Sequence, residues 1–228
     1  MTRLTLLAAA ALTLAGTAHA GRPLATEDAD VLGHGQCEAE GFYSHLKPSG
    51  VDALKGWTLQ GACGVGTHTQ VALAYSRARR GGETAQGLLL GGKTGIIARA
   101  GDGVGLTLAW GLTGEKGTGS SFEHELTYMN LVATRELASS WTAHANLGWA
   151  RSERADANST TWNLAIEKAL ANGVDLTGEV YGDDRSDERL GLGARWAASD
   201  RLSLNASWAT QNESPRVRLW TIGFKLAF

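Results

Sequence analysis

Several charged side chains recur at alternate positions, so they would share one face of extended β-strands. Pairing of successive strands would bring Glu167, Asp175 and Arg195 together as one cluster. Pairing of the last strand with the first would bring Lys225 to two glutamates as a second cluster. The full predicted inward-facing set is Glu38, Glu40, Lys93, His144, Asn163, Glu167, Asp175, Arg195 and Lys225.

The chemistry open to these clusters is electrostatic. Two carboxylates in contact repel each other unless a cation lies between them. Arg195 is the natural cation for Glu167 and Asp175, because its guanidinium can engage both and stays charged. One interpretation is a set of ion pairs that braces a narrow interior, since unpaired charges are expensive to bury. The other is a mixed-charge constriction that selects solutes.

Cys37 and Cys63 each lie thirteen positions from Gly50, which is in a predicted connection, so they would face each other across the first two strands. A disulfide is chemically permitted in an exported protein, because such a protein meets an oxidising compartment. Two unbonded small thiols are the alternative. No pair of histidines at ligand spacing accompanies the cysteines, so the sequence predicts no zinc site. No cofactor is expected.

The elements that must position these side chains are β-strands, and the last one shows the pattern most clearly. From Leu219 to Phe228, large apolar side chains occupy every second position, and the intervening ones are smaller or more polar. A final strand with one apolar face and a terminal aromatic residue resembles the closing strand of bacterial outer-membrane β-barrels. The apolar set is Trp220, Ile222, Phe224, Leu226 and Phe228.

Counting such runs predicts an all-β fold of about twelve strands. Short connections, such as 66–68, alternate with longer polar ones, such as 79–85 and 151–158. That alternation is typical of a transmembrane antiparallel up-and-down β-barrel with short periplasmic turns and longer outer loops. A secreted soluble β-sandwich is the alternative. The predicted strands are 36–46, 55–65, 69–78, 86–97, 103–112, 122–133, 140–150, 159–168, 173–182, 188–197, 201–210 and 217–228.

One parity of most predicted strands is apolar and should face lipid, as with Leu192 and Leu204. In the sixth strand the two parities compete, and we expect Met129, Leu131 and Ala133 to face outward. The eight tryptophans fall near strand ends and predict two interfacial girdles, where an amphipathic indole ring prefers to lie.

The first twenty residues have the features of a cleaved export signal, with a basic Arg3, an apolar run and a small-x-small motif at Ala18–Ala20. We therefore divide the chain into a signal peptide (1–20), a periplasmic segment (21–35) and the barrel (36–228). Arg3 is one of 21 Lys and Arg residues, so 20 would remain against 23 acidic residues. That balance does not indicate nucleic-acid binding.

The segment after the signal carries an RPL-x-TEDA-x-x-L motif, followed by a glycine and a strand with alternating glutamates. On these residues the chain resembles the outer-membrane barrels known as meta-pathway phenol-degradation proteins or transporters. The resemblance implies an outer-membrane pore for small, often aromatic compounds, and no reaction. The matching residues are Arg22, Pro23, Leu24, Thr26, Glu27, Asp28, Ala29, Leu32, Gly35, Glu38 and Glu40.

The runner-up interpretation is a barrel enzyme acting on lipid or lipopolysaccharide. His45 and His124 lie near the predicted outer rim. The serines near them in sequence are Ser44, Ser120 and Ser121. No G-x-S-x-G motif is present, and a lone histidine near a loop is usually a solvated polar residue, so we predict no enzyme.

The sequence therefore predicts a monomeric twelve-stranded barrel in the outer membrane of a Gram-negative bacterium, acting as a passive channel for a small solute. The other expected partners are outer-membrane lipid and the assembly machinery, which would recognise the strand ending at Phe228. A third interpretation is a closed structural barrel whose outer loops bind a partner.

Overall fold

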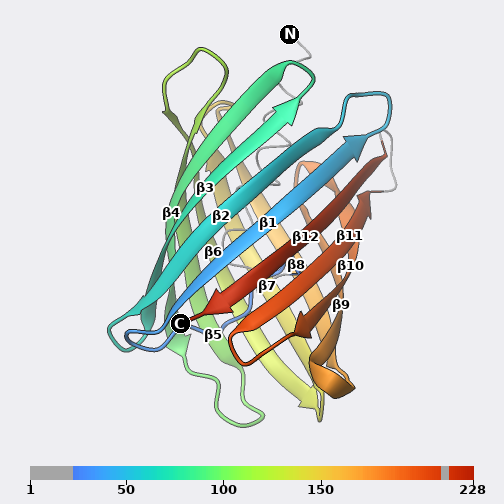
Figure 1. Ribbon diagram of the computed structural model, residues 1–228. Helices are drawn as coiled ribbons and strands as arrows, with labels where there is room; N and C mark the ends of the chain where they lie inside the picture. The colour runs from blue at the N-terminus through green and yellow to red at the C-terminus, as the bar shows by residue number, and fades with distance from the viewer. Residues whose placement is uncertain (1–22, 212–215) are drawn as a thin grey trace.

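The computed structural model describes residues 23–211 and 216–228, apart from the side chain of Asp187, so the predicted signal peptide lies outside the described residues. Those residues form twelve β-strands that close into one barrel (Figure 1). The strands are β1 (Cys37–Pro48), β2 (Leu54–Val65), β3 (Thr69–Arg80), β4 (Glu83–Ile97), β5 (Gly105–Lys116), β6 (Glu123–Ala138), β7 (Trp141–Ser152), β8 (Ala157–Ala169), β9 (Val174–Asp183), β10 (Ser186–Ala197), β11 (Leu202–Gln211) and β12 (Val217–Ala227). In this part of the chain, no helix has the length and apolar character needed to cross a membrane.

Every strand pairs antiparallel with its neighbours in sequence, and β1 pairs with β12 to close the sheet. Figure 1 shows β1 and β12 side by side, with the C-terminus at the end of β12. The register at this seam sets Glu40 opposite Lys225. The predicted antiparallel up-and-down barrel is therefore confirmed, because each strand is joined to the next along the chain and no sheet edge is left open.

Side chains alternate between the lumen and the outside of the barrel. In β2, buried and exposed positions alternate strictly from Leu54 to Val65. Leu192 is 64% exposed on the outer face, as its apolar parity predicted. The sixth strand follows the expected parity, since Met129 and Leu131 are exposed while Val132 is fully buried. Between the two ends of the barrel the outside is thus an apolar surface, and the lumen is lined mainly by polar and small side chains.

We call the end of the barrel with the β1–β2, β3–β4 and β9–β10 connections the outer end, as expected from the sequence, and the opposite end the inner end. The strand ends at the outer end differ from the prediction. β3 and β4 run on to Arg80 and Glu83 and leave only Gly81 and Gly82 between them, where a loop over 79–85 was expected. The charged side chains here do not interrupt the backbone ladder, so strand pairing continues to the turn. Gly81 supplies the positive φ, +57°, that a tight hairpin requires.

The predicted alternation of short inner turns and longer outer loops is therefore wrong in detail. β9 and β10 are also joined by a tight outer turn, at Asp184 and Arg185. The inner connection between β4 and β5 runs from residue 98 to 104 and is longer than either of these outer turns.

Cys37 and Cys63 are directly opposite each other in the register of β1 and β2, and they form a disulfide. The pairing predicted by counting outward from the β1–β2 connection is confirmed. The bond lies at the inner end of the barrel, close to where Cys37 also exchanges backbone hydrogen bonds with Phe228. The start of β1 is thus linked to both of its neighbouring strands.

Candidate functional site

The residues just before β1 run inside the barrel. Ala29 shows how they are held, because its N–H donates to Thr134 Oγ1 at 2.8 Å and its carbonyl accepts from Thr107 Oγ1 at 2.6 Å. The backbone N–H of Glu27 donates to Asn146 Oδ1 at 2.7 Å, and Asn146 Nδ2 donates to the Glu27 carbonyl at 3.0 Å. These backbone groups have no strand partner, so inward side chains satisfy them instead.

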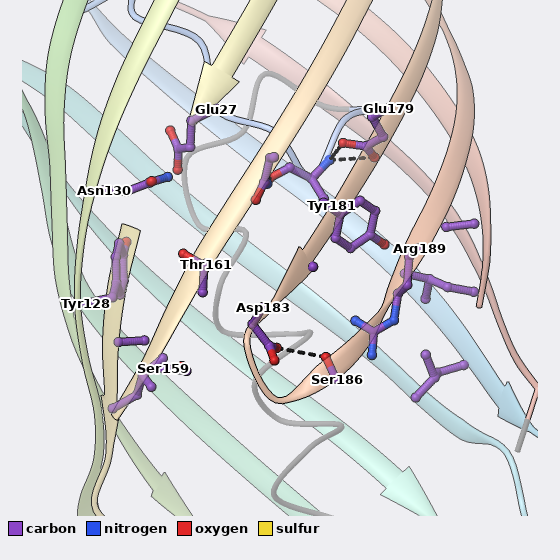
Figure 2. Close-up of a pocket in the computed structure, with 18 of the residues that line it drawn as sticks. Glu27, Tyr128, Asn130, Ser159, Thr161, Glu179, Tyr181, Asp183, Ser186 and Arg189 are labelled. Carbon is purple, nitrogen blue, oxygen red and sulfur yellow. Dashed lines mark hydrogen bonds between the residues drawn. The ribbon is translucent and has the colours of Figure 1, made fainter. Parts of the chain in front are cut away.

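For residues 23–35, this arrangement corrects the expected periplasmic segment ahead of the barrel, because they run inside it; residues 21 and 22 lie outside the described residues. Deep in the lumen, the Glu179 carboxylate accepts from the N–H groups of Ala25 and Thr26 at 2.9 Å (Figure 2). Toward the inner rim, Gly35 N–H donates to the Gly64 carbonyl at 3.1 Å. We call residues 23–35 the lumenal segment.

One lysine ties the lumenal segment to the wall. Lys93 of β4 lies 3.2 Å from the Glu27 carboxylate and 3.1 Å from that of Asp28, and its side chain is only 3% exposed. Its ammonium also donates to the Asp28 carbonyl at 3.0 Å. A buried ammonium needs such partners, because an unpaired buried charge is strongly destabilising.

The two carboxylates share this single cation unequally. Burial raises the pKa of Glu27 to about 7, and the attraction of Lys93 only partly opposes that effect. For Asp28, burial acts in the same upward direction, but attraction to Lys93 and other cations outweighs it and lowers the pKa. Asp28 therefore keeps its charge, whereas Glu27 exchanges a proton near neutral pH.

The predicted Arg195 cluster is assembled at the inner end of the lumen. Arg195 Nη2 lies 2.9 Å from both Glu167 and Asp175, and Arg195 Nε also donates to Asp175. The two acids are not directly opposite each other in the register of β8 and β9, since Glu167 lies opposite Thr177 and Asp175 lies opposite Ala169. The short 3₁₀ turn Ala171–Gly173 joins these two strands.

The second predicted cluster is also present. Lys225 lies 3.2 Å from Glu38 and 3.5 Å from Glu40 across the β1–β12 seam. His144 Nδ1 and Thr134 Oγ1 share a hydrogen bond of 2.9 Å. His144 Nε2 lies 3.7 Å from the Glu167 carboxylate, which links this wall to the Arg195 cluster. These clusters face the lumen from different walls, so the inner end carries closely paired charges of both signs.

Asn163, the remaining residue of the predicted set, holds the lumenal segment, because its amide donates to the Ala25 carbonyl at 3.3 Å. Sequence reasoning missed the role of the acids at Glu27 and Asp28 as partners of Lys93. A signal for them existed, because the residues opposite Lys93 on the neighbouring strands are Gln70 and Ala109, neither of which is acidic.

The lumenal segment borders two cavities. The inner cavity, about 390 Å³, is lined by charged side chains, including those of Asp28, Lys93 and Arg195. The outer cavity, about 350 Å³, has Ala25 and Glu27 on its inner side and continues toward the outer loops. We call the outer cavity the outer chamber.

The outer chamber has a mixed lining, in which apolar and aromatic side chains alternate with polar and charged ones, including Glu179, Asp183 and Arg189 (Figure 2). The Tyr128 hydroxyl, Asn130 Oδ1 and Arg189 Nε are buried and have no hydrogen-bond partner among the described residues. The Arg189 guanidinium lies 6.0 Å from the centre of the Tyr181 ring. Unpartnered polar atoms beside apolar and aromatic side chains are what a small polar or aromatic ligand would satisfy.

The serines and histidines considered for catalysis are not brought together. Ser44 is buried on the lumen face, whereas His45 has the opposite parity on the same strand. His124 Nε2 lies 3.1 Å from Thr127 Oγ1, and Ser120 bonds to Gly117 in the β5–β6 loop. Over residues 23–211 and 216–228, no three His, Cys, Asp or Glu side chains are grouped so that they could hold a metal ion.

A family model described as uncharacterised conserved protein UCP029691 matches residues 8–228. The chain belongs to this family. No curated protein sequence matches it. The match spans the whole described barrel and the lumenal segment, so both are features of a region that the family model covers.

Solved structures with the same fold are outer-membrane barrels. The COG4313 outer membrane channel from Pseudomonas putida F1 has a TM-score of 0.64 and 12% identity, covering 88% of this chain and 98% of that one. The KdgM porin in complex with disordered oligogalacturonate has a TM-score of 0.60 and 8% identity, covering 83% and 99%. The outer membrane phospholipase A from Escherichia coli has a TM-score of 0.52 and 13% identity, covering 92% and 97%. At these identities the likeness concerns the fold.

Proposed function

We propose that this protein is an outer-membrane channel for the passive uptake of a small solute, with aromatic compounds as the preferred class. The observation that carries the proposal is the outer chamber, a space inside a closed barrel that combines apolar and aromatic side chains with unpartnered polar atoms at Tyr128, Asn130 and Arg189. Such a lining suits a small molecule that has an apolar body and one or two polar substituents.

The proposed path continues from the outer chamber, past the lumenal segment, to the inner charged cavity. The groups proposed to select the solute along this path are Glu38, Glu40, Lys93, His144, Asn163, Glu167, Asp175, Arg195 and Lys225. The charges around Arg195 and Lys225 support this role, because each cluster sets one cation between two carboxylates and so gives the inner cavity a polar lining with an excess of negative charge. The resemblance to phenol-degradation barrels supports the aromatic class.

The cellular setting is part of the proposal. An export signal at residues 1–20 would deliver the chain across the inner membrane. The closing strand that ends at Phe228 would then be recognised by the outer-membrane assembly machinery, and the barrel would work as a monomer surrounded by outer-membrane lipid of a Gram-negative bacterium. The outward apolar surface supports a lipid environment.

The experiment compares two substitutions on one strand of the outer chamber. Ser159 lines the chamber, while Thr160 points to the exposed outer face. In proteoliposomes loaded with impermeant sugar, uptake of phenol-sized solutes should fall several-fold with Ser159→Trp and stay unchanged with Thr160→Trp. Equal uptake by the wild type and Ser159→Trp would contradict a path through this chamber.

The same vesicles test the enzyme interpretation. Release of fatty acid from the vesicle phospholipid, without solute uptake, would favour a lipid-hydrolysing barrel instead of a channel. The solved phospholipase with this fold makes the control necessary, because the fold alone does not separate the two activities.

A further inference from the structure

The outer face of four neighbouring strands carries a concentration of cationic side chains near the outer loops. The strands β3, β2, β1 and β12 are adjacent in the barrel. Their outward positions at this end include arginines and lysines that are all exposed. We define the basic patch as Lys47, Lys55, Arg77, Arg79, Arg216 and Arg218.

The basic patch lies just beyond a row of outward aromatic residues. Lys55 is two positions beyond Trp57, and Arg218 is two positions beyond Trp220, which corresponds to about 7 Å along a strand. Trp57 also contacts Tyr75 of the next strand, with ring centres 5.4 Å apart. Aromatic side chains of this kind lie at the membrane–water interface. The basic patch is therefore at the level of the lipid headgroups.

Like charges in the patch are directly opposed across the sheet. Lys55 lies opposite Arg79, and Lys47 lies opposite Arg218. None of these four side chains has an acidic partner within 4.0 Å among the described residues. Directly opposed like charges destabilise a sheet unless an anion lies between them. The arrangement indicates an anion supplied from outside the chain.

Two arginines elsewhere on the outer rim have acidic partners within the chain. Arg154 lies 3.2 Å from both Glu115 and Glu125, and Arg151 pairs with Glu153 and Asp156. Over the described residues, the chain thus places acids beside Arg151 and Arg154, whereas no acid lies within 4.0 Å of the four opposed cations of the patch.

A groove accompanies the patch. The β1–β2 loop and the start of β12 enclose a space of about 730 Å³ that is open to solvent. Five basic side chains and one carboxylate, that of Asp52, line it. The basic lining side chains are His45, Lys47, Lys55, Arg216 and Arg218. A phosphate group would find several cationic donors at one place.

We propose that the basic patch and its groove bind the phosphorylated headgroup of an outer-leaflet glycolipid of the lipid A type. The apolar surface directly below supports a lipid over a free anion, because Leu59, Leu73 and Ile222 are 52%, 65% and 63% exposed there. The phosphates would lie between the opposed cations, and the acyl chains would follow the apolar strands. The inference rests on the proposed membrane orientation of the barrel, and not on its transport activity.

The test measures binding of diphosphoryl lipid A to the full-length mature barrel in phosphatidylcholine nanodiscs. The variant Lys55→Gln/Arg79→Gln/Arg218→Gln removes three cations of the patch and keeps polar side chains. The matched control, Arg135→Gln/Lys168→Gln/Arg201→Gln, removes three cations near the inner turns. We expect the patch variant to bind at least about tenfold more weakly, and the control within about twofold of the wild type. Dephosphorylated lipid A should bind the wild type about tenfold more weakly as well.

Two results would overturn the proposal. Equal binding of lipid A by the wild type and the patch variant would remove the patch as its site. Displacement of lipid A by inorganic phosphate at similar concentrations would assign the cations to anions in general. If the triple variant does not fold, the single variants Lys55→Gln and Arg79→Gln should each weaken binding severalfold, and two unchanged single variants would also refute the site.

Discussion

Lys93 of the barrel wall and Glu27 of the lumenal segment lie 3.2 Å apart, with both side chains almost completely buried. The same ammonium reaches Asp28 at 3.1 Å. One wall residue therefore joins two successive residues of a segment that is also held by hydrogen bonds from inward side chains and by an ion pair between Asp30 and Arg99. The position of the lumenal segment, and with it the width of the proposed path, should be most sensitive to this lysine.

Loss of the Lys93 cation should release the lumenal segment. Lys93→Met keeps a long side chain but leaves Glu27 and Asp28 with no ammonium, so their burial becomes unfavourable. With Cys37 and Cys63 replaced by serine, an Ala29→Cys thiol should react with a soluble maleimide at least about tenfold faster in the Lys93→Met background. The control is Lys168→Met, which removes an exterior cation, and equal reaction rates in both backgrounds would contradict the tether.

The pH dependence of stability should depend on Glu27. Its pKa is raised from 4.5 to about 7 in the folded barrel, so the folded state binds more protons than the unfolded state between these values. The free energy of unfolding should therefore fall as pH rises through this window, by about 1–3 kcal/mol. Glu27→Gln should remove that fall in urea unfolding at pH 5 and pH 8. An equal fall in the free energy of unfolding from pH 5 to pH 8 in the wild type and in Glu27→Gln would show that Glu27 is not the group responsible.

Arg195 should influence which ions pass. If Arg195 lines the path, Arg195→Gln leaves Glu167 and Asp175 uncompensated and should shift the reversal potential in a salt gradient toward cation preference. Arg201→Gln, at the inner rim, serves as the control. A loss of stability in urea with an unchanged reversal potential would identify the cluster as a structural brace.

A new charge should lower the stability of the barrel more on the outer face than on the lumen face. Leu192 is 64% exposed on the outer face, so Leu192→Arg should lower the free energy of unfolding by about 2–4 kcal/mol in a bilayer. Ser207 lines the outer chamber, so Ser207→Arg should cost less and instead alter solute uptake. Similar unfolding penalties at both positions would be inconsistent with a lipid-facing outer surface and a polar lumen.

Much of the barrel could be predicted because strand periodicity is local. Every second residue of β12 faces lipid, and the parity carries over to Lys225, which correctly meets Glu38 and Glu40. Counting from one connection was enough to pair Cys37 with Cys63, because antiparallel register is fixed by its turn.

The lumenal segment could not be predicted because it has no period and its partners are distant. The N–H group of Ala25 donates to the Glu179 carboxylate, 154 positions away in sequence. One inward carboxylate gives no indication of which backbone it will accept from. The lengths of the turns could not be predicted for a different reason. Arg80 and Glu83 are charged residues typical of a loop, yet they continue the backbone ladder to the Gly81 turn.

The conductance of single purified barrels in a planar bilayer tests the proposed channel most directly. We predict steady ion flux through the wild type and a larger conductance with Lys93→Met, because release of the lumenal segment widens the path between the two cavities. The absence of conductance in both proteins, with phospholipid deacylation by the same preparation, would contradict the channel.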